Sequence, residues 1–215
     1  MLIAPGSKLV MIGDSITDAD RARPVGEGLF DAVGKGYVGQ VHGWLGAVCP
    51  ERRVRVVNMG QSGDTVRHLQ ARWQRDVLDL RPDWLSVMIG TNDVWRQFDS
   101  PLQTEQHVLP EEYAATLDKI LAAVRPRLQG LVLLTPFFIE PDRQDAMRAL
   151  MDHYGYMVKA AAAKHGAILV DTQAAFDTVL AHTNSNAIAW DRVHPNLVGA
   201  AVLARAFLRA VEFPF

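Results

Sequence analysis

The stretch LVMIGDSITD, residues 9–18, joins four consecutive apolar residues to a polar turn. Such an apolar run is typical of a strand that is buried on both faces, as strands are in a parallel sheet. A serine that directly follows this strand lies at the edge of the sheet where ligands bind in open α/β folds. The stretch therefore predicts the class of fold and marks Ser15 as a candidate functional residue.

Apolar, β-branched runs alternate with amphipathic stretches along the whole chain. The predicted strands are Leu9 to Ile12, Val54 to Asn58, Trp84 to Ile89, Leu131 to Thr135 and Ala167 to Val170. The predicted helices are Tyr37 to Val48, Val66 to Leu80, Pro110 to Val124, Asp145 to Lys164 and Leu197 to Ala210. This alternation predicts an α/β fold in which helices cover both faces of a parallel sheet.

Composition and charge narrow the class of protein. The 215 residues suffice for one sizeable core, and 49% apolar and 21% charged residues are close to the average of soluble globular proteins. The net charge of −2, with basic residues scattered among acidic ones, favours neither nucleic acid nor a membrane surface as a partner. We expect one domain over residues 1–215, and the lack of a signal-peptide pattern leads us to expect a cytoplasmic protein.

Polar or glycine-rich turns follow the first four predicted strands. These turns are residues 13–15 (GDS), 60–64 (GQSGD), 90–93 (GTND) and 135–138 (TPFF). Because the carboxyl ends of parallel strands share one edge of the sheet, the turns can meet in one cleft. Glycine, aspartate, asparagine and serine are also ordinary turn residues, but this does not explain why each turn carries a donor or a nucleophile.

The late loop WDRVHPN, residues 190–196, supplies the partners that a nucleophilic serine needs. Asp191 and His194 are three residues apart, which lets the carboxylate bind Nδ1 of the imidazole and leaves Nε2 free to face Ser15. In acyl transfer the hydroxyl attacks, the imidazole takes its proton and the carboxylate orients the imidazole. A histidine before a proline can also simply precede a helix, and the other motifs outweigh that interpretation.

Three donors are expected around the negative charge that develops in such a reaction. They are the backbone N–H of Ser15, the backbone N–H of Gly63 and the side-chain amide of Asn92. A side chain at position 63 would obstruct the approach of a substrate, which favours glycine there. Donors that converge on one oxygen form an oxyanion hole, and the loss of one donor typically costs about 10² to 10³ in rate.

Taken in order, these blocks resemble those of the SGNH (GDSL) hydrolase superfamily. The resemblance covers residues 13–195, most of the chain. It implies a three-layer α/β/α sandwich with a five-stranded parallel sheet. The roles that it implies are Ser15 as nucleophile, His194 as base, Asp191 as the residue that orients it, and Ser15, Gly63 and Asn92 as oxyanion donors.

Longer segments are similar to bacterial intracellular acetylxylan esterases. These segments are residues 21–24 (RARP), 89–97 (IGTNDVWRQ), 171–176 (DTQAAF) and 189–195 (AWDRVHP). The similarity implies an enzyme that removes acetyl groups from the xylose units of xylan fragments and forms homo-oligomers. The side chains that we expect to contact the sugar are Asp14, Asp93, Trp95, Arg96, Phe137, Phe138 and Trp190.

Other hypotheses remain open from the sequence. The same machinery serves a deacylase of another small ester, a lipid-derived ester or a thioester. The polar residues Arg96, Gln97 and Asp99 interrupt the apolar rim that a lipid enzyme would need. The alternation of strands and helices also fits a non-catalytic carbohydrate-binding protein or a flavodoxin-like cofactor binder. Neither of these needs Ser15, Asp191 and His194 together. No cluster of Cys or His has the spacing of metal ligands, so we expect neither metal nor cofactor.

Two surface features complete the expectations. Arg21 and Arg23 are interpreted as exposed loop residues without a specific role. The chain ends in VEFPF, residues 211–215, directly after a predicted helix. Each of its phenylalanines contributes roughly 1.5–3 kcal/mol if it is buried. The tail therefore either folds back over its own domain or packs against a neighbouring subunit of the homo-oligomer that the resemblance implies.

Overall fold

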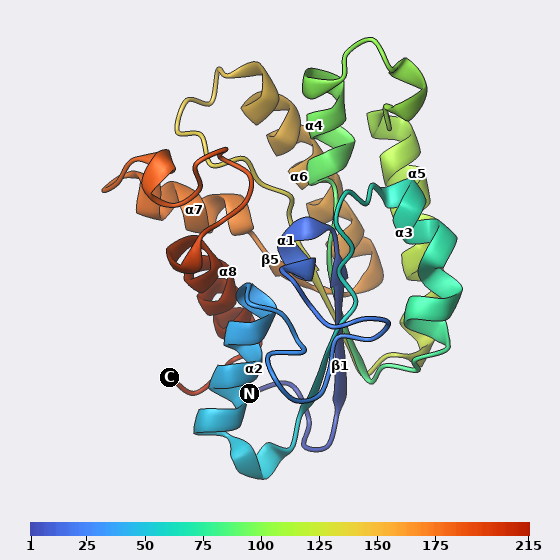
Figure 1. Cartoon of the computed structure of the whole chain (residues 1–215). Coiled ribbons are helices and arrows are strands. Elements are labelled where there is room, and N and C mark those ends of the chain that lie inside the picture. Colours follow the sequence, from blue (N-terminus) through green and yellow to red (C-terminus); the bar gives the residue numbers. More distant parts are fainter.

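Five parallel strands form one sheet in the computed structural model, which describes residues 1–215 (Figure 1). The strands are β1 (Lys8–Gly13), β2 (Arg55–Asn58), β3 (Trp84–Met88), β4 (Gly130–Leu134) and β5 (Ile168–Val170). Their order in the sheet is β2-β1-β3-β4-β5, and each neighbouring pair runs parallel. Leu9 of β1, for example, pairs with Val56 on one side and with Trp84 on the other. The predicted five-stranded parallel sheet is confirmed.

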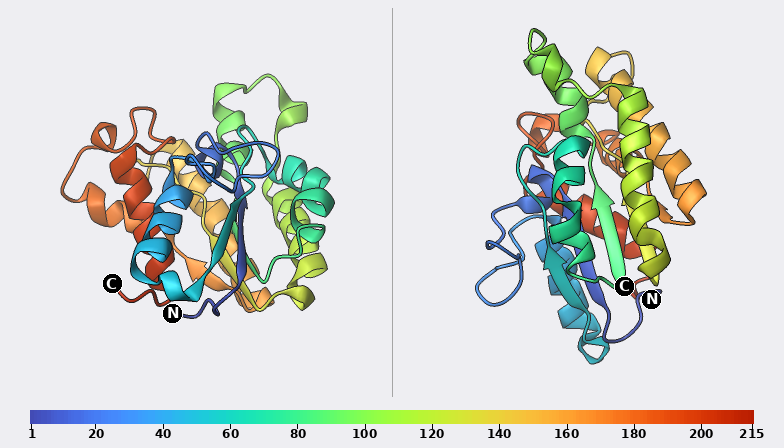
Figure 2. Two further views of the ribbon diagram at one scale, coloured as in Figure 1. Left: turned by 60° about the horizontal axis from the view of Figure 1, so that its bottom comes forward. Right: turned by 90° about the vertical axis from the view of Figure 1, so that its right-hand side faces the viewer.

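Helices cover both faces of this sheet, as Figure 1 and Figure 2 show. One face carries α2 (Tyr37–Val48) and α8 (Leu197–Ala210), and the other carries α3 (Val66–Trp73), α5 (Pro110–Val124) and α6 (Ala146–His165). The shorter helices are α1 (Ser15–Asp18), α4 (Thr91–Asp99) and α7 (Thr172–Leu180). The arrangement is the predicted three-layer α/β/α sandwich. None of its helices combines the length and the apolar character needed to cross a membrane.

The strands are continuously apolar because both of their faces are covered. The side chains of residues 9–12 in β1 are fully buried, and β3 and β4 are buried along their whole length. These residues join the apolar faces of the helices in one core cluster. Since each large apolar side chain contributes about 1.5–3 kcal/mol on burial, this layer is the main source of stability.

Local capping explains why several helices begin and end where the sequence predicts. α5 begins with Pro110, whose fixed φ and missing N–H suit the first turn of a helix. The side chain of Asp145 accepts a hydrogen bond from the backbone N–H of Arg148 at 2.9 Å at the start of α6. Gly166, with a φ of +58°, ends the same helix in the left-handed conformation. The predicted bounds of α2, α5 and α8 coincide with the observed ones.

Some elements differ from the sequence predictions. The pattern does not predict α4 or α7, because both helices are short and their first turns carry polar residues that resemble ordinary turns. The predicted helix Val66 to Leu80 is α-helical only as far as Trp73, and Gln74–Leu78 form a π-helical turn. The predicted strands begin or end one residue away from the observed bounds at several ends, which changes none of the pairings.

The place of β1 between β2 and β3 fixes where the ends of the strands meet. The chain passes from β1 to β2 on one side and then to β3 on the other, so the strand order reverses at β1. Ligand crevices in open α/β sheets lie at such a reversal, outside the carboxyl ends of the strands. The two termini lie side by side (Figure 2), where the backbone N–H of Leu2 donates to the carbonyl of Val211 at 2.8 Å.

Candidate active site

Ser15, His194 and Asp191 form one hydrogen-bonded chain. Ser15 Oγ lies 2.9 Å from His194 Nε2, and His194 Nδ1 lies 2.6 Å from Asp191 Oδ2. Ser15 is the first residue of α1, directly beyond β1, whereas the other two residues lie in the loop between α7 and α8. The carboxylate accepts a hydrogen bond from Nδ1–H, which leaves Nε2 unprotonated and free to accept the serine hydroxyl proton. The fold therefore brings together the three residues that the sequence predicts.

The turn that carries Ser15 leaves little room for other residues. A Cβ on Gly13 would lie 2.2 Å from the carbonyl oxygen of Met88 on the neighbouring strand, so this position needs glycine. Asp14 caps α1, because its Oδ1 accepts a hydrogen bond from the backbone N–H of Ile16 at 3.0 Å. These contacts turn the chain sharply at the end of β1 and place Ser15 at the edge of the sheet.

The carboxylate of Asp191 organises the loop as well as the imidazole. Its Oδ1 accepts hydrogen bonds from the backbone N–H groups of Val193, at 2.9 Å, and His194, at 2.8 Å. Burial alone raises the pKa of Asp191, but the hydrogen bonds from the His194 ring and from the two backbone N–H groups bring it below its ordinary value. The carboxylate therefore stays ionised at neutral pH, as the residue that orients a catalytic imidazole must.

The loop between α7 and α8 is attached to the rest of the protein by a few polar contacts. The backbone N–H of Ile139 donates to the carbonyl of Arg192 at 2.9 Å, and the guanidinium of Arg192 pairs with Glu140. Asn196 caps α8 and donates from Nδ2 to the carbonyl of Ala187 at 2.8 Å. These contacts hold His194 against Ser15.

Asn92 contacts the turn that contains Gly63. Asn92, in the first turn of α4, donates from Nδ2 to the carbonyl of Asp64 at 3.0 Å and accepts at Oδ1 from Arg96 at 3.1 Å. Gly63 has a φ of +85°, and a Cβ built there would meet no atom within 4 Å. Position 63 therefore favours glycine because of its left-handed backbone rather than because of crowding by the protein.

Arg72, which the sequence analysis missed, joins the segments around the site. Its buried guanidinium donates to the carbonyl oxygens of Gly13, at 3.0 Å, and Met59, at 2.7 Å. It also pairs with Asp64, at 2.6 Å, and Asp76, at 2.9 Å. The four contacts connect the ends of β1 and β2 with the turn that contains Gly63. Asp76 lies four residues after Arg72, a helical spacing that is the one local hint of this network.

Arg21 is buried, which corrects the expectation that it is an exposed loop residue. Its guanidinium donates to the carbonyl oxygens of Gly60, at 2.6 Å, and Ala22 and Pro24, each at 2.9 Å, and so supports the loop from inside. Arg23 is about half exposed and pairs with the buried Asp18 at 2.5 Å. Both arginines therefore hold the loop that follows α1.

Three of the side chains expected to contact a sugar are buried instead. Asp93 is fully buried and accepts hydrogen bonds from the backbone N–H of Val66 at 2.9 and 3.3 Å. Phe137 is fully buried, with its ring centroid 4.5 Å from that of Phe176. Asp14 is buried behind Ser15 as the cap of α1. The prediction of sugar contacts by these residues is wrong because each one serves the packing or hydrogen bonding of the fold.

Of the other expected sugar contacts, Trp95, Arg96 and Trp190 lie at the surface or near it, whereas Phe138 is a fourth buried residue. The ring of Trp95 lies 5.7 Å from that of His194, and the guanidinium of Arg96 lies 5.0 Å above Trp95. Trp190, beside the catalytic loop residues, is 83% exposed. Phe138 is buried, with Arg192 stacked 5.5 Å from its ring centre. Trp95, Arg96 and Trp190 are therefore the candidates that remain available to a substrate.

One cavity touches the serine, and a second is lined by two of the other residues expected at the site, Gly63 and Arg96. The apolar one, of about 180 Å³, touches Ser15 and His194 and is otherwise lined by Ile16, Ala19, Gly36, Tyr37, Pro195, Ala200 and Leu203. The polar one, of about 270 Å³, is lined by Gly63, Thr65, Arg67, His68, Arg96, Glu105 and Gln106. The site thus has an apolar cavity at the nucleophile and a polar cavity beside Gly63 and Arg96.

The profile of the GDSL-like lipase/acylhydrolase family matches residues 11–202. The chain belongs to this family. The chain is 54% identical to the acetylxylan esterase of Geobacillus stearothermophilus over 213 residues. The aligned residues make up 99% of this chain and 97% of the relative. The resemblance predicted from the sequence blocks is confirmed.

Solved structures support the same relationship. The crystal structure of Axe2, an acetylxylan esterase from Geobacillus stearothermophilus, has a TM-score of 0.98 and 54% identity over 100% of this chain and 98% of that one. LAE5, an α/β hydrolase from the metagenome of Lake Arreo, has a TM-score of 0.98 and 57% identity, and the match covers 99% of this chain and 98% of LAE5. Three further Axe2 structures are described as catalytic mutants, S15A, H194A and D191A. The present chain carries serine, histidine and aspartate at the same three numbers.

Two buried carboxyl groups, those of Asp14 and Asp93, have raised pKa values. Burial raises the pKa of Asp14 to about 7, against the hydrogen bond from Ile16. Burial likewise raises the pKa of Asp93 to about 7, with the nearby Asp14 as a smaller cause in the same direction. Both carboxyl groups are therefore protonated in mildly acidic solution and ionise near neutrality in the folded protein.

Asp93→Asn should change how stability depends on pH. Between pH 5 and 7 this carboxyl group is protonated when folded but ionised when unfolded, so stability falls as pH rises through this window. The amide of asparagine does not titrate and can still accept from Val66. The free energy of unfolding in urea should therefore shift in favour of the variant by about 2 kcal/mol between pH 5 and 7. The exposed Asp20→Asn serves as a control, and parallel pH curves for Asp93→Asn and the unmodified protein would contradict the expectation.

Proposed function

We propose that this protein is a serine esterase that removes acetyl groups from acetylated xylo-oligosaccharides through an acyl-enzyme. The observation that carries the proposal is the chain of hydrogen bonds from Ser15 through His194 to Asp191, at 2.9 and 2.6 Å. The choice of substrate is supported by the 54% identity to an acetylxylan esterase over nearly the whole chain.

In the first half of the reaction, Ser15 Oγ attacks the carbonyl carbon of the acetyl ester while His194 Nε2 takes the hydroxyl proton. The ionised carboxylate of Asp191 stabilises the imidazolium through Nδ1–H. The imidazolium then gives its proton to the sugar oxygen as the bond between that oxygen and the carbonyl carbon breaks. The acetyl group stays on Ser15 and the sugar leaves with a free hydroxyl group.

The second half of the reaction repeats these steps with water. His194 Nε2 takes a proton from a water molecule, whose oxygen attacks the acetyl carbon. The bond from that carbon to Ser15 Oγ breaks, and the serine oxygen regains a proton from the imidazolium. Acetate is released and the free enzyme is restored, so the cycle consumes only the ester and water.

Negative charge on the carbonyl oxygen is stabilised by the backbone N–H groups of Ser15 and Gly63 and by the amide of Asn92. An amide nitrogen carries two hydrogens, and the contact of Asn92 Nδ2 with the carbonyl of Asp64 occupies one of them. The second hydrogen serves the substrate oxygen. Arranging this donor before the substrate arrives avoids the cost of reorienting it during the reaction.

The apolar cavity at Ser15 and the polar cavity at Gly63 suit the two parts of an acetylated sugar. The apolar cavity of about 180 Å³ accommodates the methyl group of the acetyl. The polar cavity of about 270 Å³, together with the ring of Trp95, suits hydroxyl groups and the apolar face of a sugar ring. The exposed Trp190 offers a second flat surface at the rim. The polar cavity argues for a saccharide rather than a lipid as the leaving group.

Acetate release from acetylated xylose and xylobiose tests the proposed substrate. We expect faster release from these sugars than from other acetylated sugars, and faster hydrolysis of acetyl esters than of long-chain esters. Ser15→Ala should abolish release from every substrate, because it removes the attacking oxygen. Its melting temperature, measured in parallel, shows whether the fold is intact. Faster hydrolysis of a long-chain ester or an acyl thioester by the unmodified protein would favour the alternative deacylase.

Asn92→Ala should lower kcat for ester hydrolysis by about 10² to 10³ with a much smaller change in KM, because the amide acts on charge that develops in the transition state. Steady-state kinetics on nitrophenyl acetate measure both constants. Gln129→Ala, an amide deletion on an exposed residue before β4, serves as the matched control and should leave kcat unchanged. A raised KM with unchanged kcat would show that Asn92 binds the substrate in its ground state instead.

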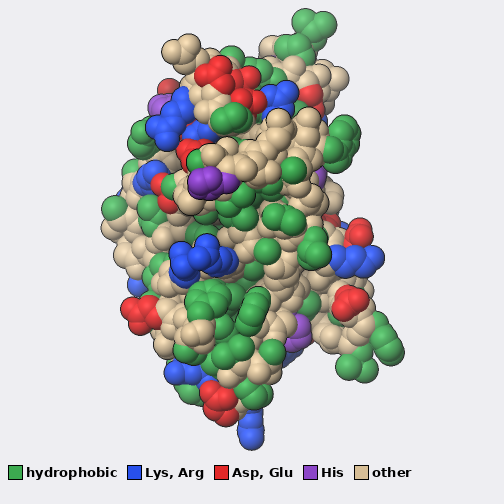
Figure 3. Space-filling view, turned by 90° about the vertical axis from the view of Figure 1, so that its left-hand side faces the viewer, with side chains coloured by type: hydrophobic (Ala, Val, Ile, Leu, Met, Phe, Trp, Pro, Cys, Tyr) green, Lys and Arg blue, Asp and Glu red, His purple; other side chains and the backbone are tan.

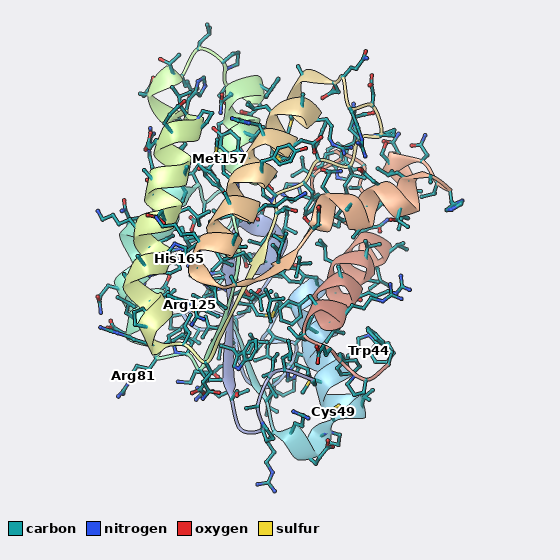
Figure 4. The ribbon with its side chains drawn as sticks, turned by 180° about the vertical axis from the view of Figure 1, so that it is seen from behind. Trp44, Cys49, Arg81, Arg125, Met157 and His165 are labelled. Carbon is teal, nitrogen blue, oxygen red and sulfur yellow. The ribbon has the colours of Figure 1, made fainter.

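The C-terminal tail supports a homo-oligomer, which we include in the proposal. Phe213 is buried against its own domain, so the first half of the tail folds back. Phe215 and Trp44 are 66% and 48% exposed, and their ring centroids lie 6.3 Å apart. Figure 4 shows Trp44 on α2. Figure 3 shows the face over α2 and α8, where apolar side chains gather between charged ones. A second subunit that covers Trp44 and Phe215 would remove these rings from water.

Light scattering on the unmodified protein tests this assembly. We expect a mass above that of one chain, and a lower mass for Phe215→Ala at the same concentration, because the substitution removes apolar contact area. Exposed Leu102→Ala, in the segment after α4, is the control and should keep the mass of the unmodified protein. A monomeric unmodified protein would contradict the assembly, whereas an unchanged mass for Phe215→Ala would contradict only the role of the tail.

A further inference from the structure

Arg96 holds the side-chain amide of Asn92 from the side opposite to Asp64. Its Nη2 donates to Asn92 Oδ1 at 3.1 Å, while Asn92 Nδ2 donates to the carbonyl of Asp64 at 3.0 Å. Asn92 and Arg96 lie four residues apart on α4, which places them on one face of that helix. The amide is buried, at 3% exposure, so these two contacts decide which way it points.

The two contacts select one orientation of the amide. If the amide turned over, Oδ1 of Asn92 would face the carbonyl oxygen of Asp64, and its NH₂ group would face the Arg96 cation. Both of these contacts would be repulsive. A cationic donor on Oδ1 also polarises the amide, which strengthens the hydrogen bond that Nδ2–H can give on its other side.

Arg96 is itself held in place by its neighbours. Its guanidinium pairs with Asp99, one turn further along α4, and lies 5.0 Å from the centre of the Trp95 ring. The ring of Trp95 in turn lies 5.7 Å from that of His194. The guanidinium thus has a fixed position between the amide and the aromatic wall beside the catalytic imidazole.

We propose that Arg96 is a positioning residue that acts on the reaction through Asn92. By fixing and polarising the amide, it keeps Nδ2–H directed at the oxygen on which negative charge develops. The inference rests on the proposed esterase function and on the oxyanion role of Asn92. It differs from the expectation that Arg96 binds sugar hydroxyls, for which its place on the wall of the polar cavity would also qualify it.

A substrate without a sugar separates these two roles. On nitrophenyl acetate, Arg96→Met should lower kcat about tenfold with little change in KM, because a hydrogen bond from a charged group to the amide is lost. Methionine keeps much of the side-chain volume against Trp95. A direct sugar contact would instead leave nitrophenyl acetate unaffected and raise KM only for acetylated xylobiose, which would overturn the inference.

The double variant Arg96→Met/Asn92→Ala shows whether the effect passes through the amide. If it does, Arg96→Met should cause no further loss of kcat in the Asn92→Ala background, so the two effects are strongly non-additive. Ser15→Ala gives the background rate to subtract. An equal loss in both backgrounds would overturn the inference, because Arg96 would then act independently of Asn92.

Matched variants guard against a merely structural effect. Arg143→Met removes a different arginine–carboxylate pair, that of Arg143 with Asp177 on α7 at 3.3 Å, and should leave kcat unchanged. Arg96→Lys keeps a cationic donor and should lose less activity than Arg96→Met. The lysine variant also keeps the test possible if Arg96→Met is unstable. Equal activity of Arg96→Lys and Arg96→Met, both folded by melting temperature, would overturn the inference.

The assays also separate this inference from the proposed function. If the unmodified protein hydrolyses no ester, or if Ser15→Ala is as active as the unmodified protein, the proposed function fails and the inference with it. If the unmodified protein is active, Ser15→Ala is inactive and Arg96→Met keeps full kcat, only the role of Arg96 is overturned.

Discussion

The buried guanidinium of Arg72 spans the ends of two neighbouring strands, because it donates to the carbonyl oxygens of Gly13 and Met59 and to the carboxylate of Asp64. Without it, the carbonyl of Met59 and the carboxylate of Asp64 would lose the donor that Arg72 supplies, which is costly in an interior that excludes water. The carbonyl of Asp64 in turn accepts from Asn92. One continuous path of hydrogen bonds therefore joins the turns after β1, β2 and β3, and the parallel sheet places those turns close enough for a single side chain to connect them.

The sequence predicted what depends on local pattern. Strands buried on both faces must be continuously apolar, so the runs at residues 9–12 and 131–134 identify the sheet. The pairing of Asp191 with His194 follows from a spacing of three residues in one loop, and the family blocks supplied Ser15 as their partner. These features can be inferred because neighbours in the chain determine them.

Features that depend on distant neighbours could not be predicted in the same way. Asp93 occupies a motif next to Asn92 but faces the backbone of Val66, so its burial depends on how α3 packs against α4. Phe137 follows a strand as a binding residue would, yet packs against α7, a helix whose short periodicity the pattern did not reveal. Arg21 has an ordinary loop sequence around it, and only the folded chain surrounds it with three carbonyl groups.

The nucleophile follows a strand of the core, whereas its base lies in a loop that is held by fewer contacts. Ser15 follows a central strand of the core, whereas His194 lies in a surface loop attached by contacts such as that between Ile139 and Arg192. Opening that loop requires less free energy than unfolding the sheet, since it removes only Ile188, Ala189 and Val193 of its own side chains from the core. The geometry needed for catalysis is therefore less stable than the sheet, and heating that opens only this loop stops turnover while the secondary structure persists.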